Sequence, residues 1–143
     1  MTPYAIDKAC KGGRDIVRKP KKRDPRKTAI NKADAAFSAY IKARDGQCVT
    51  CGSTDNLDCS HVFRRGHYST RWDETNAYAQ CRRCHMIHHN QTESYLHDYA
   101  RELHGENYFN GLRVAWNKVT KWSTEEILAM AEYYTDKLRR LEK

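Results

Sequence analysis

Four cysteines provide the clearest chemical signal in this sequence. They form two C-x2-C pairs, Cys48 with Cys51 and Cys81 with Cys84. Thiolates bind zinc tetrahedrally, and two such pairs fill the metal's four positions and leave none open for a substrate. In a cytosolic protein, paired knuckles of this kind favour zinc over disulfide bonds. We therefore expect a structural zinc site, the alternative being four free, buried cysteines.

Residues suited to acid–base and metal chemistry lie between and just after the two pairs. The 29 residues from Cys51 to Cys81 include Asp58, His61 and Asn76. On an extended segment Asp58 and Ser60 share one face, and His61 points to the other. His85 and His89 are four residues apart, so on a helix both imidazoles face the same side. Neutral imidazoles at that spacing form a good bidentate unit for a divalent cation.

At these residues the sequence resembles the HNH, or ββα-metal, nucleases. More narrowly, it is similar to the NinG/Rap recombination nucleases of phages. The similarity covers roughly residues 35–143 and leaves the N-terminal arm outside. It rests on the Cys48 knuckle, on the motif 58–61, and on the segment from Tyr68 through Cys84, of which 71–84 is the most specific.

This resemblance implies a role for each site residue. His61 would act as general base toward the attacking water, and Asn76 would hold the His61 loop through a side-chain hydrogen bond. His85 would help to bind a catalytic Mg²⁺ or Mn²⁺, which grips the scissile phosphate and stabilises the leaving 3′-oxygen. We expect Asp58 and His89 to complete that metal site, with His88 or water as alternatives.

Basic side chains surround the expected site. We interpret them as a phosphate clamp, because arginine matches phosphate geometry with paired donors, although a solvated polar loop would have the same composition. The predicted DNA-contacting residues are Arg64, Arg65, His67, Arg71, Arg82 and Arg83.

Positive charge is concentrated at the N-terminus. Residues 1–30 contain ten Lys or Arg and three acidic residues, a net charge of +7 out of +8 for the 143-residue chain. So basic a segment has little to pack into a core, and we predict that residues 1–27 form a flexible arm that contacts DNA. A solubility tail is the alternative.

The elements that must position these residues follow from apolar spacing and turn signals. We expect a helix over 28–44, short strands over 56–62 and 77–80, and a helix from the second knuckle to His89. Three more helices should follow over about 91–143: one capped by Asn90 and ended by Gly105, one with an apolar stripe from Phe109 to Val119, and one begun by a capping box at Ser123. The predicted fold is α+β, mostly α: a single domain, residues 28–143, with a zinc-stapled ββα-metal (HNH) core and flanking helices.

The combined prediction is a metal-dependent DNA endonuclease with structural zinc and catalytic Mg²⁺ or Mn²⁺. The resemblance points to branched recombination intermediates, such as Holliday junctions or D-loops, cut to leave a 5′-phosphate and a 3′-hydroxyl. Alternatives are an HNH nuclease for linear double-stranded DNA, a zinc-finger DNA-binding protein without catalysis, and a protein–protein adaptor. We expect a cytoplasmic protein with no membrane segment, and a homodimer if junctions are cut in pairs.

Overall fold

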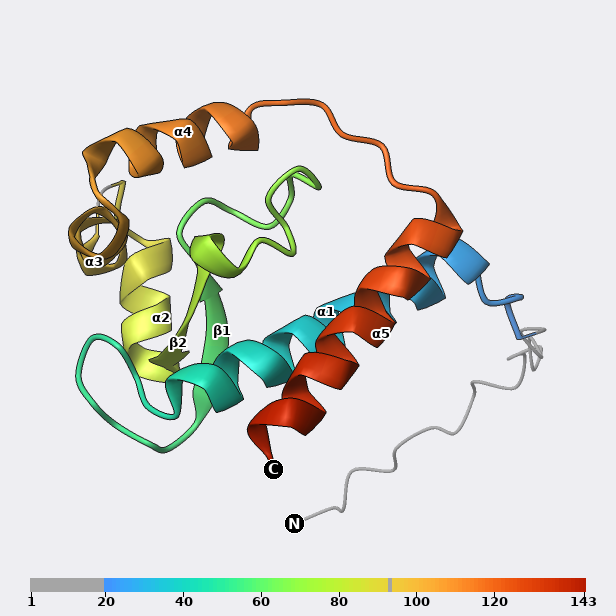
Figure 1. Cartoon of the computed structure of the whole chain (residues 1–143), viewed down its shortest axis with the longest axis horizontal. Helices are drawn as coiled ribbons and strands as arrows, with labels where there is room; N and C mark the ends of the chain where they lie inside the picture. Colours follow the sequence, from blue (N-terminus) through green and yellow to red (C-terminus); the bar gives the residue numbers. More distant parts are fainter. Residues whose placement is uncertain (1–19, 93) are drawn as a thin grey trace, which may run out of the picture.

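A two-stranded antiparallel sheet lies between two groups of helices (Figure 1). The computed structural model describes residues 20–92 and 94–143. Strand β1 (Leu57–His61) pairs with β2 (Ala77–Cys81), so that His61 lies opposite Ala77 and Leu57 opposite Cys81. Helix α2 (Arg82–His89) follows β2 directly. The fold is α+β and mostly helical, as predicted.

The remaining elements cover the two sides of this sheet. Helix α1 (Pro25–Asp45) precedes it, and the short 3-10 helix η1 (Glu74–Asn76) leads into β2. Three helices follow α2, namely α3 (Tyr95–His104), α4 (Glu106–Trp116) and α5 (Thr124–Leu141). The first and last helices lie side by side, and α3 and α4 lie at the other end of the molecule (Figure 1).

Helix α1 begins three residues earlier than predicted. Asp24 caps it by accepting a hydrogen bond from the backbone of Arg26, and Pro25 occupies the first turn, where its missing N–H costs nothing. The helix ends at Asp45, and Gly46 caps it with a φ of +69°, which suits glycine. Residues 25–27 of the predicted arm therefore belong to α1, and residues 1–19, with Cys10, lie outside the described residues.

Two apolar clusters result from the alternation of side chains along β2. Ala77 packs on one side with Phe37 of α1 and Ile127 of α5. Tyr78 packs on the other side with Leu96 of α3 and Phe109 of α4. The sheet is thus held between the two helical groups, which fixes the end of β1 and the start of α2 relative to each other.

Some predicted details of the C-terminal helices were wrong. Asn90 closes α2, and Ser94 is the N-cap of α3, with its backbone N–H donating to His97 Nδ1. Helix α4 ends at Trp116, so Val119 lies beyond it and is 91% exposed. Tyr95 and Leu103 of α3 are also exposed, because α3 packs through Leu96 and Ala100. The end at Gly105 and the capping box of Ser123 with Glu126 are confirmed.

No helix in the described part of the chain has both the length and the apolar composition that crossing a membrane requires.

Candidate functional site

The four predicted zinc ligands converge on one point. The Sγ atoms of Cys48, Cys51, Cys81 and Cys84 all lie within 4.8 Å of one another, and those of Cys51 and Cys81 are 3.6 Å apart. A tetrahedral zinc with bonds of about 2.3 Å places its sulfur ligands about 3.8 Å apart. The donor set and its geometry therefore fit zinc, with no open position for a substrate.

Backbone hydrogen bonds shape the first knuckle. The N–H of Val49 donates to the carbonyl of Ala79 on β2. Gly52, at a φ of +76°, turns the chain back so that its N–H donates to the backbone carbonyl of Cys48. Burial opposes ionisation of the Cys48 thiol, but hydrogen bonds from backbone N–H groups, among them that of Cys51, outweigh it and lower its pKa to about 6. Burial and the neighbouring thiols raise the pKa of Cys84, so of these two ligands Cys48 is the one that ionises first.

His61, the predicted general base, is the last residue of β1. A hydrogen bond to its ring defines which nitrogen carries the proton. Its Nε2 lies 2.9 Å from the backbone carbonyl of Arg71. A carbonyl oxygen only accepts, so Nε2 carries the proton and Nδ1 is left with a free lone pair. Burial lowers the pKa of His61 to about 4, against the hydrogen bond to Arg71, which raises it. The ring is therefore neutral near pH 7, the state that a base requires.

Asn76 holds the chain that follows His61. Its side-chain oxygen accepts the N–H of Phe63, and its side-chain nitrogen donates to the carbonyls of Phe63 and Thr70. The Asn76 side chain is fully buried, and its backbone carbonyl accepts the N–H of Val62. These bonds join η1 to the loop after β1 and fix where that loop leaves His61.

His88, on α2, also contacts the end of β1. Its Nε2 donates to the carbonyl of His61 at 2.8 Å, and its Nδ1 contacts the hydroxyl of Ser94. Burial lowers the pKa of His88 to about 4, so this ring is also neutral. Because both ring nitrogens are engaged, His88 is placed to orient β1 rather than to bind a metal.

His85 and His89 bring two ring nitrogens together. Their Nε2 atoms are 2.9 Å apart, and the Nδ1 of His85 lies 3.0 Å from a carboxylate oxygen of Asp58. Asp58 therefore contacts the side of the His85 ring away from His89, where a carboxylate orients a ligating imidazole. Partial burial and the nearby charges of His85, Arg64 and Arg65 lower the pKa of His89, which favours its neutral, ligand-competent form.

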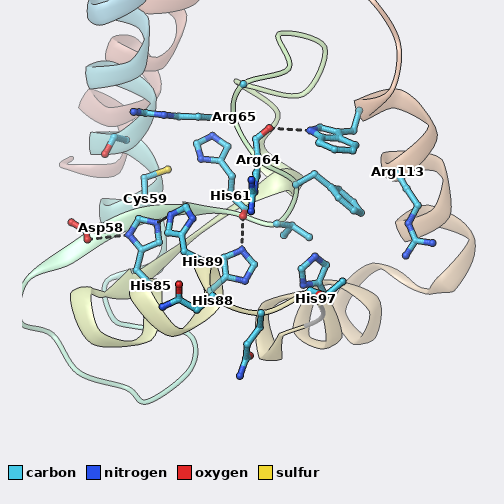
Figure 2. A pocket seen from close by; sticks show the side chains of 18 of the residues that line it. Asp58, Cys59, His61, Arg64, Arg65, His85, His88, His89, His97 and Arg113 are labelled. Atoms are coloured by element: carbon cyan, nitrogen blue, oxygen red, sulfur yellow. Dashed lines mark hydrogen bonds and ion pairs between the residues drawn. The ribbon is translucent and has the colours of Figure 1, made fainter.

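A single cleft of about 1220 Å³ contains this group. Figure 2 shows the imidazoles of His61, His85, His88 and His89 gathered beside Asp58. Ser60, which directly precedes His61, is fully buried and does not line the cleft.

The predicted phosphate contacts separate into three groups. Arg64 and Arg65 are exposed and line the cleft. Arg82 and Arg83 are exposed in the first turn of α2 and do not line it. The third group, His67 and Arg71, does not line the cleft, and other residues hold both side chains in place. The ring of His67 stacks on Trp116, with ring centroids 4.0 Å apart, and Arg71 forms an ion pair with Asp34.

Sequence reasoning missed two cleft residues on the far helices, Arg113 of α4 and His97 of α3. Figure 2 shows Arg113 on the α4 side of the cleft. Arg113, Trp116 and Asn117 are three and four residues apart, a spacing that places them on one helix face. That periodicity could have grouped them, but nothing local in the sequence directs this face toward His61.

One comparison with known proteins finds a match. A family model described as Bacteriophage Lambda NinG protein matches residues 7–143. No curated protein and no solved structure matches the chain. The match begins at residue 7 rather than near residue 35, so the expectation that the basic arm lies outside the resemblance was wrong.

Proposed function

Because the chain belongs to the NinG family of bacteriophage proteins, we propose that it is a metal-dependent DNA endonuclease that acts in phage recombination. The observation that carries the proposal is the pairing, in one cleft, of a neutral His61 whose Nδ1 is free with the His85–His89 pair. A zinc-binding module that only recognises DNA has no need of either feature. The ββα-metal (HNH) character of the β1–β2–α2 unit is part of this proposal.

His61 is the general base in this proposal. Its Nδ1 takes a proton from a water molecule, whose oxygen forms a bond to the scissile phosphorus. The bond from phosphorus to the 3′-oxygen breaks, and that oxygen takes up a proton from solvent. The products carry a 5′-phosphate and a 3′-hydroxyl. Asn76 and His88 hold the strand end and the loop on either side of this base.

His85 and His89 are the protein ligands that we assign to a catalytic Mg²⁺ or Mn²⁺, with Asp58 orienting His85. Bound there, the cation would supply Lewis-acid stabilisation of the phosphate. The four-cysteine zinc site has a different task, because it joins the first knuckle to the start of α2 and keeps the histidines of α2 beside β1.

The basic side chains of the cleft are assigned to the DNA backbone. Arg64 and Arg65 lie on the loop after β1, and Arg113 lies on α4. Cations on both sides of a cleft suit a polyanion that passes between them. Branched DNA is the substrate that we propose from the family, and a second copy of the chain would be needed for paired cuts across a junction.

The test is cleavage of a four-way junction, a linear duplex of the same sequence and a supercoiled plasmid, with and without Mg²⁺ or Mn²⁺. We expect metal-dependent cleavage with preference for the junction, and 5′-phosphate ends that a ligase can rejoin. Equal cleavage of the linear duplex would favour a general HNH nuclease. Tight binding without cleavage in either metal would favour the non-catalytic DNA-binding alternative.

A further inference from the structure

The hydrogen bond that determines which ring nitrogen of His61 carries the proton depends on one peptide group. The carbonyl of Arg71 accepts the proton of His61 Nε2 at 2.9 Å, and this carbonyl belongs to the peptide that links Arg71 to Trp72. Rotation of that peptide would remove the acceptor. His61 could then carry its proton on either nitrogen, and the Nδ1 lone pair would no longer be assured.

Asp34 of α1 holds the side chains on both sides of this peptide. Its carboxylate accepts the Nε of Arg71 at 2.8 Å, the Nη2 of Arg71 at 2.5 Å and the indole N–H of Trp72 at 3.0 Å. The remaining Nη1 of Arg71 donates to the carbonyl of Arg65, on the loop that follows β1. A bidentate arginine–carboxylate pair is among the most directional contacts available, so the peptide between the two side chains has little freedom.

We infer that Asp34 is a positioning residue for His61: it fixes the Arg71–Trp72 peptide, whose carbonyl keeps the His61 proton on Nε2 and leaves Nδ1 free as the base. This inference rests on the proposed nuclease function for its catalytic meaning. Its structural content is the tautomer of one imidazole, which can be measured without any cleavage assay. Asp34 itself touches no substrate in this arrangement.

The decisive variant is Asp34→Asn, which keeps the size of the side chain but removes its charge and one acceptor. Ring ¹⁵N shifts of His61 should change from a pure Nε2–H tautomer to a mixture. Single-turnover cleavage at saturating metal and DNA should fall about tenfold or more, with zinc content and DNA affinity retained. Arg71→Lys, which keeps the charge but cannot form the paired contact, should act in the same direction, and the double variant should be little worse than either single variant.

Asp45→Asn is the matched control. Asp45 is a second α1 carboxylate paired with an arginine, Arg44, and it accepts the N–H of Ala79, away from His61. Its loss should lower stability and leave the His61 tautomer unchanged. A comparable tautomer shift in this control would show a general loosening and overturn the inference.

Each remaining outcome is decisive. A pure Nε2–H tautomer in both Asp34→Asn and Arg71→Lys overturns the inference, whether or not the cleavage rate falls. A shifted tautomer with an unchanged cleavage rate also overturns it. If the wild-type protein cleaves no DNA, the proposed function fails, and the tautomer comparison still decides whether Asp34 sets the state of His61. If Asp34→Asn does not fold, Arg71→Lys decides the matter.

Discussion

The Nε2 atoms of His85 and His89 lie 2.9 Å apart, within hydrogen-bond distance of each other and at the spacing that two ligands of one divalent cation would have. In an octahedral site, two bonds of about 2.1 Å at a right angle place ligand atoms about 3 Å apart. The arrangement follows from their spacing of one helical turn on α2 and from the contact of His85 with Asp58. In the proposed mechanism, it separates the metal ligands on α2 from the general base at the end of β1.

Metal affinity should depend on these two histidines. His85→Ala and His89→Ala should each raise the Mn²⁺ concentration needed for half-maximal cleavage, and excess Mn²⁺ should partly restore the rate. Asp58→Asn should weaken Mn²⁺ binding by about 10- to 100-fold, because Asp58 orients a ligand. Calorimetric titration with Mn²⁺ alone measures the same loss without DNA. Unchanged Mn²⁺ affinity in both alanine variants would place the catalytic metal elsewhere.

The chemical step should depend on His61. His61→Ala should reduce single-turnover cleavage by about 10²- to 10⁴-fold, because it removes the group that takes the proton from water. Zinc content and junction affinity should stay at wild-type values. His104→Ala is the control, since the Nε2 of His104 contacts the hydroxyl of Tyr78 and lies outside the cleft. Near wild-type turnover in His61→Ala would show that another group acts as base.

Zinc should be a condition of folding. Cys81→Ala removes one of the four sulfur ligands, and structural zinc of this kind contributes on the order of 10 kcal/mol. The variant should lose zinc by elemental analysis and should not melt cooperatively. Cys59→Ala should keep one zinc per chain, because Cys59 packs against the core beside α1 and is not in the cluster. A zinc-free chain that melts like the wild type would contradict the assignment.

The basic N-terminus should govern affinity rather than chemistry. Deleting residues 1–19 keeps the Asp24 cap of α1 and the contact of Arg26 with the carbonyl of Trp122. DNA binding should weaken, and its logarithmic dependence on salt should become shallower, because fewer counterions are released. The cleavage rate at saturating protein should remain. Equal affinity of both proteins at every salt concentration would assign the segment another role.

Acid should destabilise the fold in a definite range of pH. Burial lowers the pKa of His61 from an ordinary value of 6.5 to about 4, so between these values the unfolded chain binds a proton that the folded chain does not. The contribution of His61 to stability is therefore fully present above about pH 6.5 and is lost as the pH falls toward 4. In His61→Gln the free energy of unfolding should fall less steeply from about pH 7 to about pH 5. Urea unfolding with zinc retention checked at each pH measures this, and parallel slopes would contradict it.

Local signals in the sequence predicted most of the elements. The C-x2-C pairs, the capping box at Ser123 and the glycine at 105 each indicate an element boundary through contacts within a few residues. The early start of α1 could also have been predicted, because Asp24 followed by Pro25 is a typical N-cap and first turn. Asn90 and Ser94 are both acceptable caps, and only the end of α2 at Asn90 decides between them.

Long-range contacts of the site could not be predicted in the same way. His61 contacts Arg71, which is 10 residues away in the sequence, and Arg71 contacts Asp34, which is 37 residues away. No periodicity links these three positions. Arg71 illustrates the difficulty, since its type and its place in a basic loop indicated phosphate binding. Instead the fold pairs its guanidinium with a carboxylate from α1. Arg113 is the converse case, because only the packing of α4 brings it to the cleft.

The position of α5 determines when, during synthesis, the Arg71–Trp72 segment can gain all of its contacts. The hydroxyl of Tyr134 donates to the carbonyl of Trp72 at 2.6 Å, and its ring packs against Phe37 of α1. Because α5 leaves the ribosome after every other described element, a nascent chain presents the Arg71–Trp72 segment without this support. In the proposed nuclease, polypeptides truncated before residue 134 would lack this contact and should cleave DNA more slowly than the full chain.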